Sequence, residues 1–279
     1  MDNRFKIKVI KALIVAVYLV FYSVPLLYLI ANSFKPMEDF SNPALFFPTR
    51  PTLDAYRDIF YGTAERPAWI LTFRNSLVIA TLSALISIVV ALPAAYAFAR
   101  ARFMASNHLF FWLLSTRFAP GACFIIPYVL FFKSLNMLDS VVAIALAHTS
   151  FNVPFSVLLL TSFVAMIPES VDKSAQLDGC SWSLFFRKIL LPNLKIGLIT
   201  TFFFAWAFSW SEMALGLALS TTYNSTPFTV YVTRFLEEIG SAAEWAQAAA
   251  AGVISIIPGT VLIALYGKYI LKGFTLGRL

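Results

Sequence analysis

The sequence predicts an all-α integral membrane protein of six transmembrane helices, and its composition and its apolar runs carry this prediction. Of the 279 residues, 59% are hydrophobic and only 13% are charged, whereas a soluble domain carries about 25% charged residues. Six apolar runs come close to the roughly 20 residues that cross a bilayer as a helix. Lipid offers no partner to a free backbone amide, so each crossing segment is expected to be helical.

The predicted spans cover, with approximate ends, residues 10–31, 76–98, 109–132, 140–165, 194–219 and 246–267. The first run follows four basic residues, a pattern that also begins a cleaved signal peptide. It continues to Asn32 without a clear small-x-small cleavage pattern, which favours a retained first helix. No repeat or soluble segment interrupts the six runs, so residues 1–279 are expected to form a single transmembrane domain.

The basic residues are concentrated in alternate connections. Thirteen of the 21 Lys and Arg lie in the N-terminus, in residues 100–102, in residues 167–195 and in the C-terminal tail, which share one side if the helices alternate. Cytoplasmic loops carry such an excess of positive charge, so both termini are predicted to be cytoplasmic. The net charge of +7 therefore indicates the topology of a multi-pass protein in lipid, and no nucleic-acid partner is expected.

Two segments on the opposite side are long enough to meet a partner outside the cell. Residues 32–75 are polar and punctuated by Pro, and residues 220–245 place Phe235, Ile239 and Trp245 among acidic side chains. This second pattern indicates a short amphipathic piece, either an interfacial helix or a docking surface.

The cytoplasmic connection 167–192 is predicted to form helix, sharp turn and helix. Glu169 and Asp172 fall in the first turn of the first helix, where acidic side chains complement the positive end of the helix dipole. Gly179 supplies the left-handed residue that ends this helix. Ser181 is expected to cap the stretch that follows. The result is a rigid elbow that projects from the membrane.

This elbow resembles the cytoplasmic signature loop of permeases from ATP-binding-cassette (ABC) importers. The usual form is E-E-A-A-x-x-D-G-A, followed by a Phe and then by Leu-Pro. Here residues 172–180 read D-K-S-A-Q-L-D-G-C, with Phe185 or Phe186 and then Leu191-Pro192 after them. In that family the short helix before the Gly docks in a groove of the ATPase subunit and transmits its closure to the membrane helices.

The resemblance implies an ATPase-coupling surface that comprises Glu169, Asp172, Lys173, Ala175, Asp178 and Gly179. Ala175 would be the small contact residue, Asp178 the structural carboxylate and Gly179 the elbow itself. Lys173 stands where the signature has Glu, and Ser174 where it has the first Ala. Either the partner differs at this point or Asp172 substitutes, although Asp172 lies about 100° around the helix from Lys173.

Further segments extend the resemblance over nearly the whole chain, to the maltose-type second permease subunit of carbohydrate importers. These segments are 73–77 with 94–100, 117–120 with 126–127, 208–213 and 268–277. The resemblance implies type I ABC importer permease architecture in a bacterial inner membrane, and a sugar or polyol as cargo. It implies three kinds of protein partner: a second homologous permease, an ATPase dimer that holds ATP and Mg, and an extracytoplasmic solute-binding protein.

Ionisable residues inside the bilayer are functional candidates because they are costly to bury in lipid. Arg117 falls within the third span and Glu212 within the fifth, beside Trp210. These three residues are candidates for the translocation pathway, with Trp210 stacked on a sugar ring. Alternatively, Arg117 and Glu212 satisfy each other or a partner subunit. His148 and Asn152 in the fourth span are weaker candidates.

No motif for catalysis or nucleotide binding occurs: H-E-x-x-H, G-x-S-x-G, C-x-x-C and G-x-x-x-x-G-K-[ST] are all missing. The chain is therefore predicted to be no enzyme and to bind no cofactor or metal of its own. A secondary transporter driven by an ion gradient is the alternative, but it often uses paired intramembrane acids, and here Glu212 is the only acid clearly inside a span. An intramembrane enzyme or an assembly protein would need no elbow.

Overall fold

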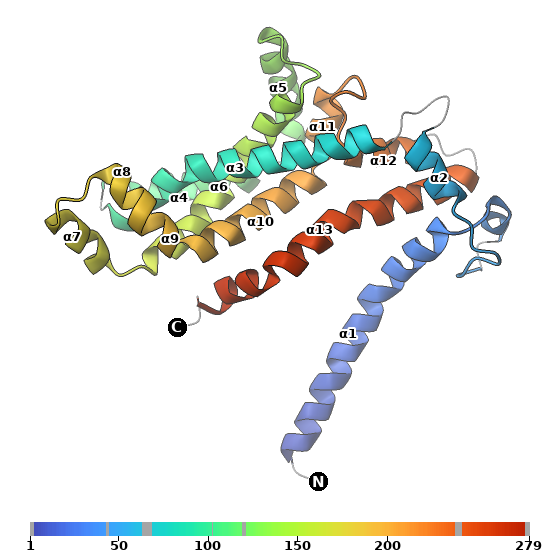
Figure 1. Cartoon of the computed structure of the whole chain (residues 1–279), viewed down its shortest axis with the longest axis horizontal. Helices are drawn as coiled ribbons and strands as arrows, with labels where there is room; N and C mark the ends of the chain where they lie inside the picture. Colours follow the sequence, from blue (N-terminus) through green and yellow to red (C-terminus); the bar gives the residue numbers. More distant parts are fainter. Residues whose placement is uncertain are drawn as a thin grey trace. The chain divides into compact units, whose positions relative to one another are not determined.

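The computed structural model describes residues 3–42, 45–62, 69–101, 103–118, 121–237 and 242–276, and every regular element in these ranges is helical (Figure 1). The all-α prediction is therefore confirmed. The chain forms two compact units. The first comprises Met1–Ile70 with Tyr231–Ile257, and the second comprises Leu71–Val230 with Pro258–Leu279.

The first unit contains the N-terminal helix and a folded outer segment. Its elements are α1 (Asn3–Ser33), η1 (Met37–Ser41), α2 (Asp54–Tyr61), most of α12 (Phe228–Glu237) and the first half of α13 (Ala242–Leu276). The side chain of Asp39 accepts hydrogen bonds from the backbone amide and the hydroxyl of Thr49, both at 2.7 Å. These bonds lower the pKa of Asp39. The amide of Gln247 donates to Asp58 at 2.9 Å, so α13 and α2 are joined by a polar contact.

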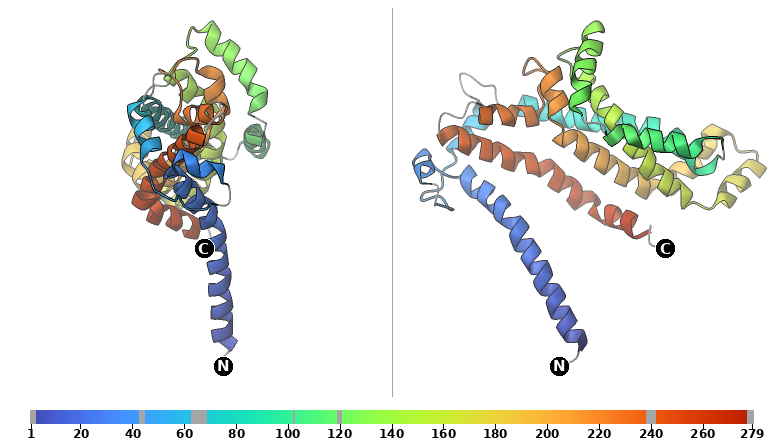
Figure 2. Two further views of the ribbon diagram at one scale, coloured as in Figure 1. Left: turned by 90° about the vertical axis from the view of Figure 1, so that its right-hand side faces the viewer. Right: turned by 180° about the vertical axis from the view of Figure 1, so that it is seen from behind.

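The second unit is built around α6. Its long elements are α3 (Ile70–Arg100), α4 (Ser106–Phe118), α5 (Ala122–Ser134), α6 (Val141–Ala165), α10 (Lys195–Ser211) and α11 (Ala214–Leu219). α6 packs against α4 and α10, and the run of α6 beside α10 is visible from both sides in Figures 1 and 2. Ala143 and Ala147 on α6 and Ala205 on α10 are fully or almost fully buried. Such small residues allow close approach of helix backbones, which is how helices associate in lipid.

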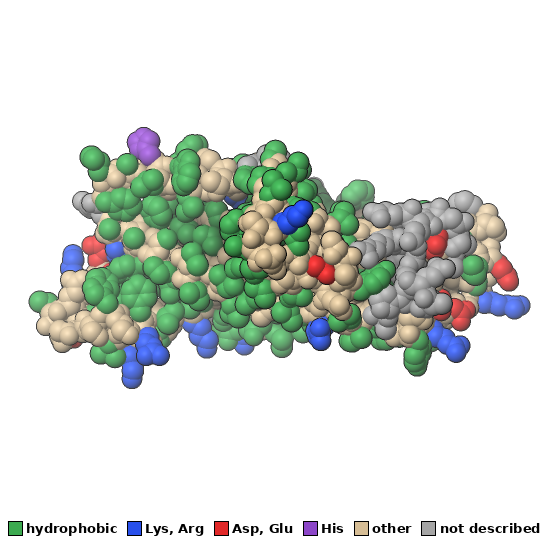
Figure 3. Space-filling model, turned by 90° about the horizontal axis from the view of Figure 1, so that it is seen from above, with side chains coloured by type: hydrophobic (Ala, Val, Ile, Leu, Met, Phe, Trp, Pro, Cys, Tyr) green, Lys and Arg blue, Asp and Glu red, His purple; other side chains and the backbone are tan. Residues whose placement is uncertain are grey.

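Within the described residues, four helical segments are each long and apolar enough to cross a membrane: Ile7–Ser33, Ile70–Arg100, Val141–Ala165 and Glu244–Leu271. The count reaches six if each of two bent helix pairs forms one span. Hydrophobic side chains cover much of the face drawn in Figure 3. The exposed hydrophobic side chains of the chain include Trp112 on α4 and Ile126 on α5. A surface of this kind is expected where a protein contacts lipid rather than water.

The predicted span 194–219 is not one continuous helix. α10 ends at Ser211, the backbone of Glu212 is extended (φ −72°, ψ 123°), and α11 begins at Ala214. The physical reason is local, because the side chain of Glu212 accepts a hydrogen bond from the amide of Leu215 at 3.1 Å. It thereby satisfies a free amide in the first turn of α11. The predicted span 109–132 likewise corresponds to two helices, α4 and α5.

Asp139 ties the turn between α5 and α6 to the segment after α11. Its carboxylate accepts hydrogen bonds from the amides of Thr221 and Thr222, at 2.8 and 2.9 Å, and from the hydroxyls of Thr222 and Ser225. Burial acts to raise the pKa of Asp139, but the hydrogen bonds outweigh burial and the pKa is lowered. Nearby, the amide of Asn75 on α3 donates to three backbone carbonyls of residues 223–226. The connection between α11 and α12 is therefore held by α3 and by the turn between α5 and α6.

α6 and α10 approach each other closely at Gly197. A Cβ added there would lie 2.6 Å from Cγ of Phe163. We expect Gly197→Ala to lower the free energy of unfolding by about 1–3 kcal/mol, because the helices must separate to admit the methyl group. Thermal unfolding of the purified chain in detergent measures the effect.

Gly259→Ala in α13 is the matched control, because a Cβ at Gly259 meets no atom within 4 Å. This variant should be neutral or slightly stabilising, since Ala favours a helix over Gly. Trimming the neighbour in the double variant Gly197→Ala, Phe163→Leu should recover part of the loss. Wild-type stability of Gly197→Ala alone would contradict the close contact.

Candidate functional site

The predicted elbow is present in the second unit. α7 (Glu169–Leu177) begins directly after Pro168, and Gly179 has a φ of 69°. The hydroxyl of Ser181 accepts a hydrogen bond from the amide of Leu184 at 3.4 Å. The expected helix start, left-handed glycine and serine cap are thus all confirmed. A Cβ at Gly179 would meet no atom within 4 Å, so glycine is required by the backbone conformation and not by lack of space.

The chain after the elbow re-enters the bundle through a second bend. α8 (Trp182–Phe185), η2 (Phe186–Leu190) and α9 (Leu191–Asn193) follow one another, and this stretch makes an angle of 78° with α10. Phe185, Leu190 and Leu194 are buried in a hydrophobic cluster with residues of α3 and α6. The elbow is therefore anchored to the helix bundle by apolar packing.

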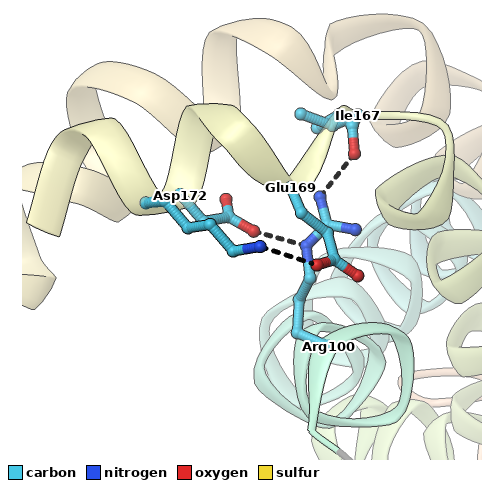
Figure 4. A network of polar contacts seen from close by, with 5 residues as sticks. Arg100, Ile167, Glu169 and Asp172 are labelled. Atoms are coloured by element: carbon cyan, nitrogen blue, oxygen red, sulfur yellow. Dashed lines mark hydrogen bonds and ion pairs between the residues drawn. The ribbon is translucent and has the colours of Figure 1, made fainter.

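Asp172 is held by Arg100 at the end of α3 (Figure 4). The Nε of Arg100 donates to a carboxylate oxygen of Asp172, and its Nη2 donates to the carbonyl of Ile167 at 2.6 Å. Asp172 is only 7% exposed. Its carboxylate therefore faces the bundle. The alternative in which Asp172 replaces the signature Glu on the outer face does not match this geometry.

The six candidate coupling residues divide between two faces of the elbow. Asp172 and Ala175 are buried, and Ala175 packs in the same hydrophobic cluster as Phe185. The other four are exposed, namely Glu169, Lys173, Asp178 and Gly179. Nζ of Lys173 lies 3.5 Å from a carboxylate oxygen of Glu169, which is one turn earlier in α7. Both side chains are well exposed, so this ion pair contributes little to stability.

Three further residues, two in the elbow and one at the end of α3, were not predicted from the sequence. Leu177 is 88% exposed and Trp182 is 61% exposed, and together they give the outward side an apolar character. Leu177 lies four residues after Lys173, so helical spacing places both on one face. Arg100 lies in residues 94–100, one of the segments that carry the family resemblance. No local pattern in the sequence pairs it with Asp172, which is 72 positions later.

Arg117 and Glu212 meet at a small pocket inside the second unit. The pocket has a volume of about 110 Å³, and its walls include these two residues with His148, Asn152 and Phe208. The guanidinium of Arg117 lies over the ring of Phe208, 5.0 Å from its centroid. No ion pair joins Arg117 to Glu212 in the described structure, where Glu212 instead caps α11. The two predicted residues are therefore brought together at a cavity without neutralising each other.

Trp210 does not line this pocket. It is 9% exposed, stacks on Trp206 with ring centroids 5.1 Å apart, and meets the ring of Phe73 edge-on at 5.5 Å. The indole of Trp206 in turn donates to the hydroxyl of Thr81 at 3.3 Å. Trp210 therefore belongs to the packing between α3 and α10.

Polar side chains of α6 form a hydrogen-bonded group beside the pocket. Nδ1 of His148 and the hydroxyl of Ser209 share a hydrogen bond of 2.7 Å. The amide of Asn152 donates to the hydroxyl of Ser83 at 3.1 Å and to the carbonyl of Ala205 at 3.0 Å. Across the described residues, no three His, Cys, Asp or Glu side chains are grouped as a metal site would require.

No family model matches the chain. Curated relatives do match over almost its full length. A diacetylchitobiose uptake system permease of Streptomyces coelicolor is 28% identical, over 96% of this chain and 94% of the relative. A glucose import system permease of Saccharolobus solfataricus is 29% identical, over 98% and 96%.

Solved structures match the fold. One is a bacterial ABC transporter that imports alginate, with a TM-score of 0.79, 18% identity, and coverage of 96% of this chain and 98% of the other. Another is a bacterial alginate ABC transporter in complex with an alginate-bound periplasmic protein, with a TM-score of 0.66, 13% identity, and coverage of 94% and 92%. The fold is that of an importer permease.

The contact between Arg100 and Asp172 is expected to hold the elbow in place. We expect Arg100→Gln and Asp172→Asn each to destabilise the elbow by about 1–3 kcal/mol, because each leaves a buried partner without its ion pair. The double variant should lose less than the sum of the two, as is usual for side chains in direct contact. Protease cleavage rates within residues 168–181 measure the local opening.

Lys173→Gln is the control for this experiment, because it removes a charge from the same helix in an exposed pair. Its effect should stay below about 0.5 kcal/mol. Strictly additive losses from the Arg100 and Asp172 variants would argue that the two side chains act independently.

Proposed function

Because the chain is a permease subunit of an ABC importer, we propose that it imports a sugar or a polyol and couples ATPase closure to alternating access. The observation that carries this proposal is the similarity, over more than nine-tenths of the chain, to permeases named for diacetylchitobiose and glucose uptake. The elbow at residues 169–181 supports it, because it offers a rigid, exposed helix at the end of a helix bundle.

The proposed assembly has four further components. A second homologous permease completes the translocation unit, and two ATPase subunits bind ATP and Mg. An extracytoplasmic binding protein delivers the cargo, in line with the periplasmic protein present in one of the similar structures. The exposed apolar length of α1 is suited to contact with lipid or with the second permease.

The proposed orientation places both termini and the elbow in the cytoplasm of a cell with a bacterial inner membrane. The basic residues of the N-terminus and of residues 167–195 favour this orientation. The folded outer segment around Asp39 and α2 then faces the binding protein.

Coupling is proposed to pass from the outward face of α7 to the bundle. Lys173, Leu177 and Asp178 meet the ATPase, and Glu169 supports Lys173 through their ion pair. Gly179 fixes the angle between α7 and α8. Movement of α7 then reaches α3 through Arg100 and reaches α6 through the cluster that contains Ala175. The buried position of Ala175 gives it a packing role in this scheme, in place of direct contact with the ATPase.

Arg117 and Glu212 are proposed to line the translocation pathway, because both are walls of a polar pocket within the bundle. Trp210 is assigned to packing, because it is buried, one face of its ring stacks on Trp206, and it meets the ring of Phe73 edge-on. The chain's own contribution to transport is conformational, and the chemistry of ATP hydrolysis takes place on the partner.

Isolation of the complex tests the assembly. The chain is purified from its native host with a C-terminal tag in mild detergent, and co-purifying proteins are identified by mass spectrometry. We expect an ATPase with a phosphate-binding loop and a second multi-helix permease. Recovery of the chain alone, under conditions that keep a known importer intact, would overturn the proposal and favour transport driven by an ion gradient.

Substitution at Gly179 tests the elbow. Gly179→Val should reduce ATP-driven transport by about tenfold or more, because a β-branched residue resists the left-handed backbone by about 1–2 kcal/mol or more. Gly179→Asn should retain most transport, because Asn tolerates that backbone and a side chain there meets no neighbour. ATPase stimulation and uptake are measured together. Full transport by normally expressed Gly179→Val would remove Gly179 from the coupling scheme.

A further inference from the structure

One ring nitrogen of His148 is hydrogen-bonded to a neighbouring side chain, and the other has no hydrogen-bond partner among the described residues. The side chain is 3% exposed, on α6 within the bundle. Nδ1 shares its hydrogen bond with Ser209, whereas Nε2 has no hydrogen-bond partner among the described residues. A buried polar atom without a partner costs about 1–3 kcal/mol. Packing alone is a poor reason to keep an imidazole at this position.

The same residue forms part of the wall of the pocket that holds Arg117 and Glu212. Three helices therefore bring a guanidinium, a carboxylate and an imidazole to one cavity. Glu212 is engaged through one carboxylate oxygen with the amide of Leu215. Asn152 and Ser209 are further polar walls. The amide nitrogen of Asn152 donates to Ser83 and Ala205, and the hydroxyl of Ser209 is hydrogen-bonded to Nδ1 of His148. The ionisable groups at the pocket are thus His148, Arg117 and Glu212.

The aromatic side chains in the pocket wall are suited to contact with a carbohydrate. Phe208 and Phe151 line the pocket beside the polar groups, and flat apolar rings suit the C–H faces of a sugar while polar groups meet its hydroxyls. The volume of about 110 Å³ exceeds the roughly 10–15 Å³ that one water needs. The cavity can therefore admit the hydroxyl-bearing edge of one sugar unit and excludes a whole oligosaccharide.

We propose that this pocket is a cargo subsite contributed by this permease, in which Nε2 of His148 recognises a hydroxyl group of the sugar. The proposal rests on the function proposed above and names the residue that gives it selectivity. Ser209 acts as a positioning residue, because its hydrogen bond to Nδ1 fixes the ring. Nε2 is covered in the conformation described, so cargo reaches it when the walls of the pocket separate during the transport cycle.

Two substitutions separate the two ring nitrogens. The amide nitrogen of Asn can take the place of Nδ1, so His148→Asn keeps a partner for Ser209 and removes the group at Nε2. The longer Gln places its amide near Nε2, so His148→Gln restores that group. Ser156→Ala is the matched control, because Ser156 is also on α6, fully buried and without a hydrogen-bond partner for its hydroxyl, but it does not line the pocket.

The experiment measures uptake by the complete importer in cells that lack other sugar permeases. Radiolabelled glucose, diacetylchitobiose, other common mono- and disaccharides and mannitol identify the cargo of the wild type. Competition by the monodeoxy forms of that cargo then maps which hydroxyl is recognised. Uptake is normalised to the amount of assembled complex recovered with the ATPase.

We expect His148→Asn to raise the apparent KM by about tenfold, as for the loss of one hydrogen bond. Its preference for the cargo over one particular monodeoxy form should fall by a similar factor, which a merely structural role would not produce. His148→Gln should recover part of both effects, and Ser156→Ala should retain the wild-type preference.

Wild-type KM and wild-type preference in His148→Asn would overturn the subsite and leave only water to meet Nε2. An equal loss of preference against every deoxy form would also overturn it, because no single hydroxyl would then be read. If the wild-type importer itself takes up none of the panel, the proposed function fails and the subsite falls with it. This outcome is distinct, because it is visible before any variant is compared.

Discussion

One side chain at the end of α3 joins the elbow to the membrane bundle. Arg100 reaches both the carboxylate of Asp172 and the carbonyl of Ile167, on either side of the start of α7. A planar guanidinium can hold two acceptors in a fixed geometry, which an ammonium cannot do. The nine residues of α7 are too few for a helix to be stable by itself in water. Its position is therefore set by this contact and by the burial of Ala175, and any force on its outer face is passed to α3.

The interior of the second unit obeys the constraint that lipid imposes on polar groups. Asn75 binds backbone carbonyls of the connection after α11, and Asn152 joins α6 to α3 and α10. These bonds join segments that are distant in the sequence. They therefore fix the register of the helices and also satisfy hydrogen-bonding groups. Because water is not available to replace a lost partner in lipid, the polar contacts are expected to resist local opening. Only one of the two ring nitrogens of His148 takes part in this pattern, and the buried hydroxyl of Ser156 on the same helix takes no part in it.

Composition and local pattern predicted the helical class and the geometry of the elbow, and four of the six predicted spans each correspond to one helix of the structure. They succeeded because hydropathy and the requirement for glycine at Gly179 are properties of short segments. The break at Glu212 was not predicted, because an apolar window does not register a single side chain that caps a following helix. The directions of Asp172 and Ala175 also depended on tertiary contacts, with Arg100 in one case and with the hydrophobic cluster in the other. Trp210 appeared as a sugar-stacking candidate because sequence does not tell which aromatic rings already have neighbours.

Glu212 has two structural roles, one at the start of α11 and one in the wall of the polar pocket. One carboxylate oxygen fixes where α11 begins, and the same side chain forms part of the wall of the polar pocket. A substitution that alters the polarity of the pocket here also alters the start of a helix. In the proposed subsite, adaptation to a new cargo is therefore easier at positions such as Phe208, whose side chain lines the pocket without capping a helix. Glu212 is constrained by the helix that it caps, whereas pocket side chains without a capping role can be changed. This difference guides a redesign of the selectivity of the proposed subsite.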